Sequence, residues 1–84
     1  MRITLRLYGN LRRYAPDRRD RTEMNLADGA TIRSALDSLG VPDTAWWMAA
    51  VNDQVVPADV SLHEGDLVEV FDPVAGGEND QAFR

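Results

Sequence analysis

The apolar residues between positions 32 and 39 recur with the period of an α-helix, and they stand between regions that alternate like β-strands. Ile32 is followed by apolar residues three, four and seven positions later, which places all of them on one helix face. Thr31 is a suitable N-cap, although Ser34 replaces the Glu or Gln of a full capping box, and Gly40 begins the helix stop. A lone amphipathic helix must bury its apolar face on another layer, so we expect it to pack against a sheet.

Five segments have the composition or the alternation of β-strands. Apolar residues at positions 3, 5 and 7 alternate with mostly polar neighbours, which indicates a half-buried first strand. The run from Trp46 to Val51 is apolar throughout, which indicates a strand covered on both faces, and Asn52 and Asp53 form a tight-turn pair after it. A single helical turn is expected between Leu11 and Tyr14. The expected strands are residues 2–8, 22–26, 46–51, 54–56 and 67–71.

The order of these elements restricts the architecture. Two hairpins flank the helix, so the helix can cross one face of a mixed sheet in which the first and last strands are parallel central neighbours. A chain of 84 residues buries about 60–65% of its unfolded surface, which is enough for one modest core. We therefore predict a single α+β domain with four to five strands packed on one main helix. The predicted core residues are Ile3, Leu5, Leu7, Leu26, Ile32, Leu36, Leu39, Val51, Leu62, Leu67 and Val70.

Composition excludes several classes of function. The sequence contains no cysteine, so disulfides, thiolate metal sites and thiol nucleophiles are excluded, and we expect a cytoplasmic protein. No stretch approaches the ~18 consecutive apolar residues of a membrane-spanning helix. We therefore expect no membrane association.

Charge is divided unevenly along the chain. Residues 1–22 carry seven arginines and two aspartates, whereas the whole chain has a net charge of −5 and a pI near 4.6. Phosphate would be repelled by most of such a surface, so we do not expect nucleic-acid binding. The cluster Arg12, Arg13, Arg18, Arg19 and Arg21 is either a solvated loop or short helix, or a docking site for an acidic partner.

The remaining polar residues form no pattern of a self-contained enzyme. His63 is the only histidine and lies in an expected turn beside Glu64, with no second metal-ligating partner in the pattern. No serine has the setting of a catalytic triad. We expect neither a metal site nor a bound cofactor. Of Trp46 and Trp47, one is expected in the core and the other on a partner surface, and the sequence does not distinguish them.

The C-terminal region carries the most specific motif. The last strand runs into Pro73-Val74-Ala75-Gly76-Gly77, a strip whose final two residues have no side chains. Taken alone, the two glycines also fit an ordinary flexible exit from the domain. The segments that precede the two glycines decide between a functional arm and a flexible exit.

In this order and spacing, the chain resembles the sulfur-carrier family that includes the small subunit of molybdopterin synthase (MoaD) and the thiamine-pathway carrier (ThiS). The resemblance implies a ubiquitin-like β-grasp domain over residues 1–77 with a C-terminal diglycine arm, followed by a flexible extension at residues 78–84. The segments that carry it are Leu5-Arg6-Leu7-Tyr8-Gly9-Asn10-Leu11-Arg12, Gly29-Ala30-Thr31-Ile32, Leu39-Gly40-Val41-Pro42, Val51-Asn52-Asp53, Glu64-Gly65-Asp66 and Pro73-Val74-Ala75-Gly76-Gly77.

The resemblance also implies a function, in which a terminal glycine carboxylate is adenylated and then converted to a thiocarboxylate that delivers sulfur. Gly77 would be the reactive residue, and Phe71, Pro73, Val74, Ala75 and Gly76 would contact partners. Molybdopterin or tungstopterin biosynthesis is the expected pathway. The expected partners are an adenylating enzyme that resembles ubiquitin activators, the large subunit of molybdopterin synthase and a processing protease.

Two features depart from the family pattern. Asp72 stands where proline is frequent, and residues 78–84 follow Gly77, so that Gly77 has no free carboxylate in the chain as written. Two alternatives therefore stay open beside the sulfur carrier. One is a non-catalytic β-grasp interaction module, and the other is a ubiquitin-like modifier that joins its glycine to lysines of other proteins.

Overall fold

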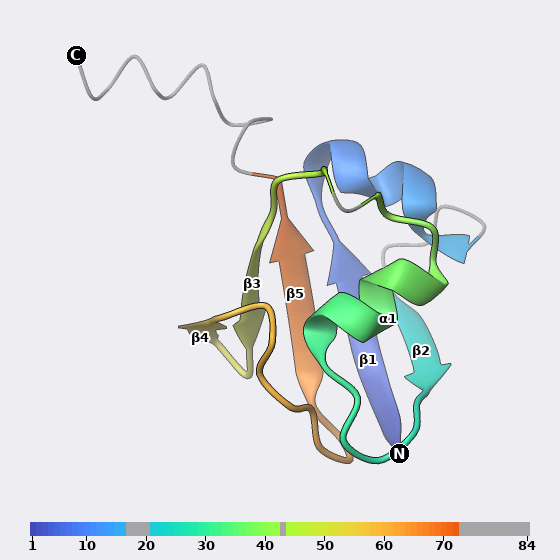
Figure 1. Cartoon of the computed structure of the whole chain (residues 1–84), viewed down its shortest axis with the longest axis vertical. Helices are drawn as coiled ribbons and strands as arrows, with labels where there is room; N and C mark the ends of the chain where they lie inside the picture. The colour runs from blue at the N-terminus through green and yellow to red at the C-terminus, as the bar shows by residue number, and fades with distance from the viewer. Residues whose placement is uncertain (17–20, 43, 73–84) are drawn as a thin grey trace.

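The computed structural model describes residues 1–16, 21–42 and 44–72, which form a five-stranded mixed sheet with one α-helix across one face (Figure 1). A 3-10 helix, η1, follows the first strand at the end of the sheet. The elements are β1 (Arg2–Leu7), η1 (Gly9–Tyr14), β2 (Thr22–Asn25), α1 (Ile32–Ser38), β3 (Met48–Val51), β4 (Gln54–Val56) and β5 (Leu67–Phe71).

The sheet has the strand order β2-β1-β5-β3-β4, so the last strand occupies its centre. β1 and β5 are parallel, with Leu5 opposite Val68, and every other pair of neighbouring strands is antiparallel. This confirms the predicted parallel pairing of the first and last strands. It also confirms the ubiquitin-like β-grasp fold.

Helix α1 has well-formed ends. At its start the Thr31 hydroxyl accepts the Ser34 N–H (3.1 Å), and the Ser34 hydroxyl accepts the Thr31 N–H (2.8 Å). The prediction of an incomplete capping box was therefore wrong, because a serine hydroxyl can bond to the N-cap backbone as Glu or Gln does. At its end Gly40 has φ 88°, and the Val41 N–H donates to the Leu36 carbonyl (3.1 Å), as in a Schellman motif.

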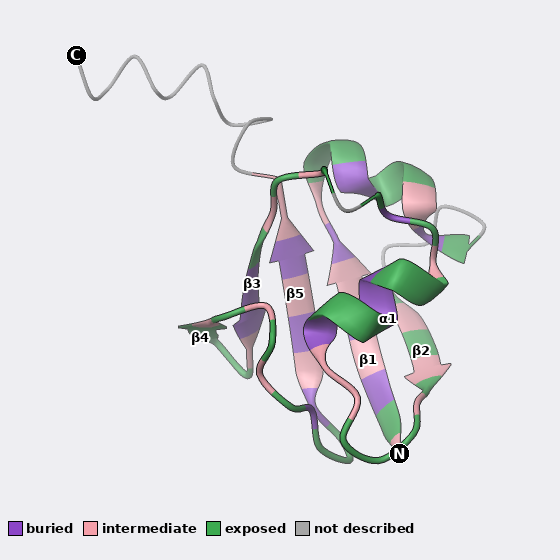
Figure 2. Ribbon diagram, in the orientation of Figure 1, coloured by how far each residue is buried: buried purple, intermediate pink, exposed green. Residues whose placement is uncertain are grey.

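The core lies between α1 and the sheet, and seven of the predicted core residues are fully buried there (Figure 2). Leu26, Leu39 and Val51 are half-buried and pack against this core, whereas Leu67 is half-buried without joining it, so the assignment of Leu67 to the core was wrong. Within β5 the reason is alternation: Val68 and Val70 point toward the helix, which directs Leu67 to the opposite face. Other buried apolar residues that were not in the predicted core are Leu11, Ala15, Ala35, Val41, Ala49, Ala50 and Val68.

The segment that begins at Trp46 departs from its predicted structure. Strand β3 starts only at Met48, whose side chain is exposed, so the strand is not covered on both faces. Trp46 and Trp47 precede the strand. Trp46 is 70% exposed, whereas Trp47 is half-buried against the core, where the Arg33 guanidinium lies 5.7 Å from its ring centre. The structure thereby assigns Trp47 to the core and Trp46 to the surface.

The short connections follow the sequence signals. Asn52 and Asp53 have φ values of 51° and 74°, which a two-residue turn between twisted strands requires. The predicted turn between Leu11 and Tyr14 is the second part of η1, and Leu11 anchors it in the core.

Candidate functional site at the end of the central strand

The central strand β5 ends at Phe71, and Asp72 is the last described residue of the chain. Phe71 is half-buried and stands in register with Met48 of β3. The other predicted contact residues, Pro73, Val74, Ala75 and Gly76, and the predicted reactive residue Gly77 lie outside the described residues. The arm therefore begins at the middle of the sheet, at the end where η1 lies (Figure 1).

The face of the sheet opposite α1, here called the open face, carries mixed chemistry. Register places Arg6, Glu69 and Ala50 in one row, followed at the β4 edge by Val55. Met48 and Val55 are exposed by 40% and 64%, respectively. An apolar strip thus runs beside a charged centre on a surface that α1 does not cover.

The charged centre of the open face is a compact cluster of Arg6, Tyr8 and Glu69. The Tyr8 hydroxyl donates to Glu69 Oε2 (2.6 Å), Arg6 Nη1 lies 3.7 Å from the same oxygen, and the Arg6 guanidinium lies 5.2 Å from the Tyr8 ring centre. Burial, followed by the hydrogen bond to Glu69, raises the pKa of Tyr8 above its usual value of 10.0. The cluster is thus suited to recognition with fixed geometry, and it contains no activated nucleophile.

The base of the arm contacts the η1 segment. Asn10 Nδ2 lies 3.4 Å from Asp72 Oδ2, which links the last described residue to the start of the 3-10 helix. Tyr8 supplies a second link, since its N–H donates to the Val70 carbonyl (2.9 Å). These bonds hold the end of β5 against the start of η1.

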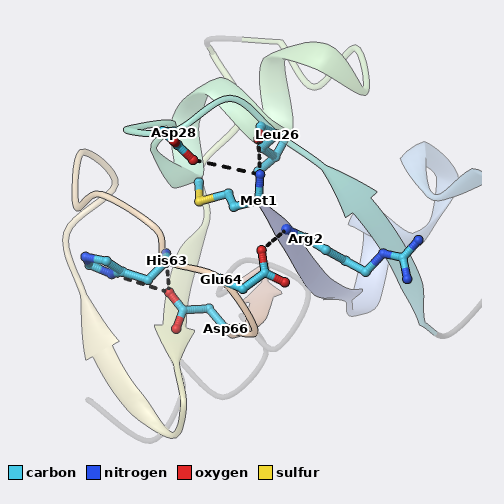
Figure 3. Close-up of polar contacts among 7 residues, drawn as sticks. All are labelled: Met1, Arg2, Leu26, Asp28, His63, Glu64 and Asp66. Carbon is cyan, nitrogen blue, oxygen red and sulfur yellow. Dashed lines mark hydrogen bonds and ion pairs between the residues drawn. The ribbon is translucent and has the colours of Figure 1, made fainter.

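The polar residues around His63 lie at the opposite end of the sheet, near the N-terminus (Figure 3). Asp66 is 8% exposed and closes a turn by accepting the His63 N–H (2.8 Å), and Glu64 accepts the Arg2 N–H (2.9 Å). The His63 ring is exposed, with its Nδ1 3.9 Å from Asp66. These contacts stabilise the turn and connect it to the start of β1.

The residues that the structure describes contain neither a group of potential metal ligands nor a helix suited to crossing a membrane. Among residues 1–16, 21–42 and 44–72, no three or more His, Cys, Asp or Glu side chains are grouped to hold a metal ion. Within the same part of the chain, no helix has the length and apolar character needed to cross a membrane.

The match to a protein family decides the affiliation of the chain. Residues 5–77 match the model of the ThiS family, so the match begins within β1 and ends at the second glycine of Gly76-Gly77. The chain belongs to the ThiS family. This confirms the family inferred from the sequence motifs, whereas no curated protein matches the sequence.

Solved structures confirm the fold of this ThiS-family chain. SAMP1 from Haloferax volcanii is similar with a TM-score of 0.69 and 20% identity, over 92% of this chain and 100% of that one. A putative molybdopterin converting factor subunit 1 from Pyrococcus furiosus gives 0.66 and 22%, over 86% and 97%. In a complex of subunits 1 and 2 of the molybdopterin-converting factor from Helicobacter pylori, the matching chain gives 0.58 and 16%, over 87% and 95%.

Sequence reasoning missed the cluster of Arg6, Tyr8 and Glu69. A signal for it was present, since Arg6 and Tyr8 fall on the polar side of the first strand and Glu69 interrupts the apolar last strand. These residues come together only through the register of the parallel strands β1 and β5, which sets Arg6 opposite Glu69.

Proposed function

We propose that this ThiS-family chain is a sulfur carrier whose reactive group is a thiocarboxylate at Gly77. The observation that carries the proposal is that the family match ends at Gly77, six residues beyond the end of the central strand. In this role the chain is a co-substrate, and the bond-making steps are catalysed by its partners.

The proposed chemistry has two steps. The Gly77 carboxylate attacks the α-phosphorus of ATP and displaces pyrophosphate, giving an acyl adenylate. A persulfide of a partner then attacks the acyl carbon through its terminal sulfur and displaces AMP, which gives an acyl disulfide. A second thiol of that partner attacks the partner's own sulfur in this bond, so that the thiocarboxylate leaves and a disulfide remains on the partner. The first step needs an accessible carboxylate oxygen and the second needs an accessible acyl carbon, and glycine at both final positions removes the Cβ atoms that would hinder either approach.

The arm has a length suited to entering another protein. From Asp72 to Gly77 an extended chain reaches roughly 17 Å, which is enough to bring a carboxylate into a buried ATP site. Pro73 restricts the base of the arm, which lowers the entropy lost when it is ordered in a partner. We propose that Val74 and Ala75 seat at the mouth of that site and that Gly76 passes through it.

The extension makes processing necessary under this proposal. Residues 78–84 place an amide at Gly77, and an amide cannot take the role of the attacking carboxylate. We propose that a protease hydrolyses the Gly77–Glu78 bond and thereby converts a stored precursor into the active carrier. The polar composition of Glu78-Asn79-Asp80-Gln81 suits such cleavage.

The open face is the proposed docking surface for the adenylating enzyme. Its apolar residues Phe71, Met48 and Val55 lie beside the Arg6, Tyr8 and Glu69 cluster, the combination of apolar contact and fixed charge found in specific interfaces. Burial of the exposed Val55 and Met48 side chains would favour association, and the charged cluster would select the partner.

Molybdopterin or tungstopterin biosynthesis is the proposed pathway. It is supported by the similarity to the Pyrococcus furiosus chain named as a putative molybdopterin converting factor subunit, and by the subunit complex from Helicobacter pylori. A large synthase subunit would then be the second partner of the arm.

The deciding test compares the full chain with a chain that ends at Gly77. Each is incubated with the activating enzyme, ATP and a sulfur source, and its intact mass is measured. We expect the mass gain of one oxygen replaced by sulfur on the shorter chain alone. Absence of the gain from both chains, with an activating enzyme proven on its own carrier, would favour the non-catalytic module.

A ubiquitin-like modifier is the second candidate. The observation that favours it is the structural similarity to SAMP1, which is named small archaeal modifier protein 1. The chain ending at Gly77 would then form isopeptide bonds with lysines of other proteins. A series of covalent adducts that resists thiols and denaturant would support this function, and intact-mass analysis of the same sample separates it from thiocarboxylate formation.

A further inference from the structure

A groove opens at the base of the arm, between η1 and the residues that precede β3. The described residues that give it its character are Leu11, Tyr14 and Trp46 on the apolar side, and Asn10, Arg13 and Asp72 on the polar side, around a volume of about 240 Å³. We refer to it as the Trp46 groove. A second, more polar hollow shares its Asn10 and Arg13 wall.

The chemistry of the groove is that of a binding surface. Trp46 is 70% exposed and is the most exposed large apolar side chain among the described residues. Leu11 is 3% exposed and belongs to the core, so it provides a fixed floor, while Tyr14 is half-buried against the same core. The Arg13 guanidinium lies 6.0 Å from the Tyr14 ring centre, at the edge of the apolar part. An apolar side chain with a neighbouring carboxylate would fit both halves of this surface.

The position of the groove restricts which protein can occupy it. Asp72 is both a wall of the groove and the residue from which the arm continues. Because Gly77 is within roughly 17 Å of Asp72 along an extended chain, an enzyme that holds Gly77 in its active site also lies beside the groove. A contact here is continuous with the one made by the arm.

Resting on the proposed function, we propose that the Trp46 groove is a separate docking site for the enzyme that activates Gly77. Its occupant is a loop of that enzyme with an apolar side chain packed on Leu11, Tyr14 and Trp46 and a carboxylate facing Arg13. The groove differs from the open face in place and in chemistry. Its role is to add affinity for the enzyme at the base of the arm.

The test uses the chain ending at Gly77 and the activating enzyme from the same organism, with ATP–pyrophosphate exchange as the readout. Trp46→Ala and Arg13→Glu should each raise the KM for the carrier about tenfold while leaving kcat unchanged, as expected for loss of a docking contact. Trp46→Phe should retain most of the affinity. Arg33→Glu introduces the same charge change on α1, outside the groove, and should have no effect. An unchanged KM for both groove variants would overturn the proposal.

Binding measured by calorimetry without ATP separates this proposal from the proposed function. If the chain ending at Gly77 binds the enzyme but supports no exchange, the proposed function fails and the groove is judged by the binding of the same variants. If it neither binds nor supports exchange, both proposals fail. Iodide quenching of Trp46 in a Trp47→Phe background is compared between the full and shortened chains. Protection in the full chain alone would assign the groove to residues 78–84 and overturn the enzyme as occupant.

Discussion

Single side chains in this small domain carry large shares of its stability, and Leu36 is the clearest case. It is 1% exposed at the centre of the helix–sheet interface, next to β-strand residues that are equally buried. Leu36→Ala should lower the free energy of unfolding by about 2–5 kcal/mol, because it leaves a cavity in the core between α1 and the sheet. Urea denaturation measures this change. Val55→Ala, an apolar truncation at an exposed site, should cost less than about 0.5 kcal/mol and serves as the control.

The Tyr8 hydroxyl reports on the charged cluster of the open face. Because burial and Glu69 raise its pKa above 10.0 in the folded protein, the folded state retains the phenol proton at a pH where the unfolded chain loses it. Its contribution to stability is therefore complete below pH 10 and is lost as pH rises through the folded-state pKa. Glu69→Gln should lower the Tyr8 pKa only in part, since burial is the larger cause. Ultraviolet titration with Tyr8→Phe as the blank measures the shift, and an unchanged pKa in Glu69→Gln would contradict the assignment.

At the scale of the elements, the two ends of α1 are fixed by different devices. The start depends on the reciprocal Thr31 and Ser34 hydroxyl bonds, and the end depends on Gly40. Thr31→Ala should cost about 1 kcal/mol of stability. Ser34→Ala should cost a similar or smaller amount. The double variant should lose less than the sum, because the two bonds form one unit. Thermal unfolding of the three variants tests this, and strict additivity would argue against a capping box.

The turn between β3 and β4 combines backbone strain with side-chain bonds. Asn52 has φ 51°, its Oδ1 accepts the Leu67 N–H (3.0 Å), and its Nδ2 donates to Asp66 (3.0 Å). Asn52→Ala should lower stability by about 1–3 kcal/mol, since it removes both bonds and leaves a residue poorly suited to positive φ. Asn52→Gly removes the bonds without that strain. Chemical denaturation should therefore place the glycine variant between wild type and alanine, and the reverse order would contradict this account.

Local signals predicted the elements better than they predicted which residues fill the core. The spacing from Ile32 and the stop at Gly40 were enough for α1, because both depend on neighbours in sequence. The assignment of Leu67 to the core failed because apolar character alone does not give the phase of a strand, which the register with β1 decides. The sequence did not predict the Trp46 groove. Its residues come from η1, the segment before β3 and the end of β5, which only the folded chain brings together.

At the scale of the whole molecule, the two proposed surfaces should differ in their response to salt. Contacts of the open face are largely apolar, so Val55→Asp or Phe71→Ala should weaken binding to the activating enzyme at every salt concentration. Replacing Arg12 and Arg13, together with Arg18 and Arg19, by alanine should weaken it mainly at low salt, where charges are poorly screened. Affinity measured between about 0.05 and 0.5 M salt tests this. If the arginine changes abolish activation while the apolar changes have no effect, the open face is the wrong surface.

The parallel pairing of β1 with β5 joins the two ends of the domain, with Thr4 opposite Leu67. Closing so long a loop costs more entropy than forming either hairpin, so we expect this pairing to limit the rate of folding. During translation the sheet cannot be completed until Phe71 has left the ribosome, and Gly76 and Gly77 follow it by only five and six residues. Because β5 is the last strand, Gly76 and Gly77 emerge only when every strand of the domain is already available for folding.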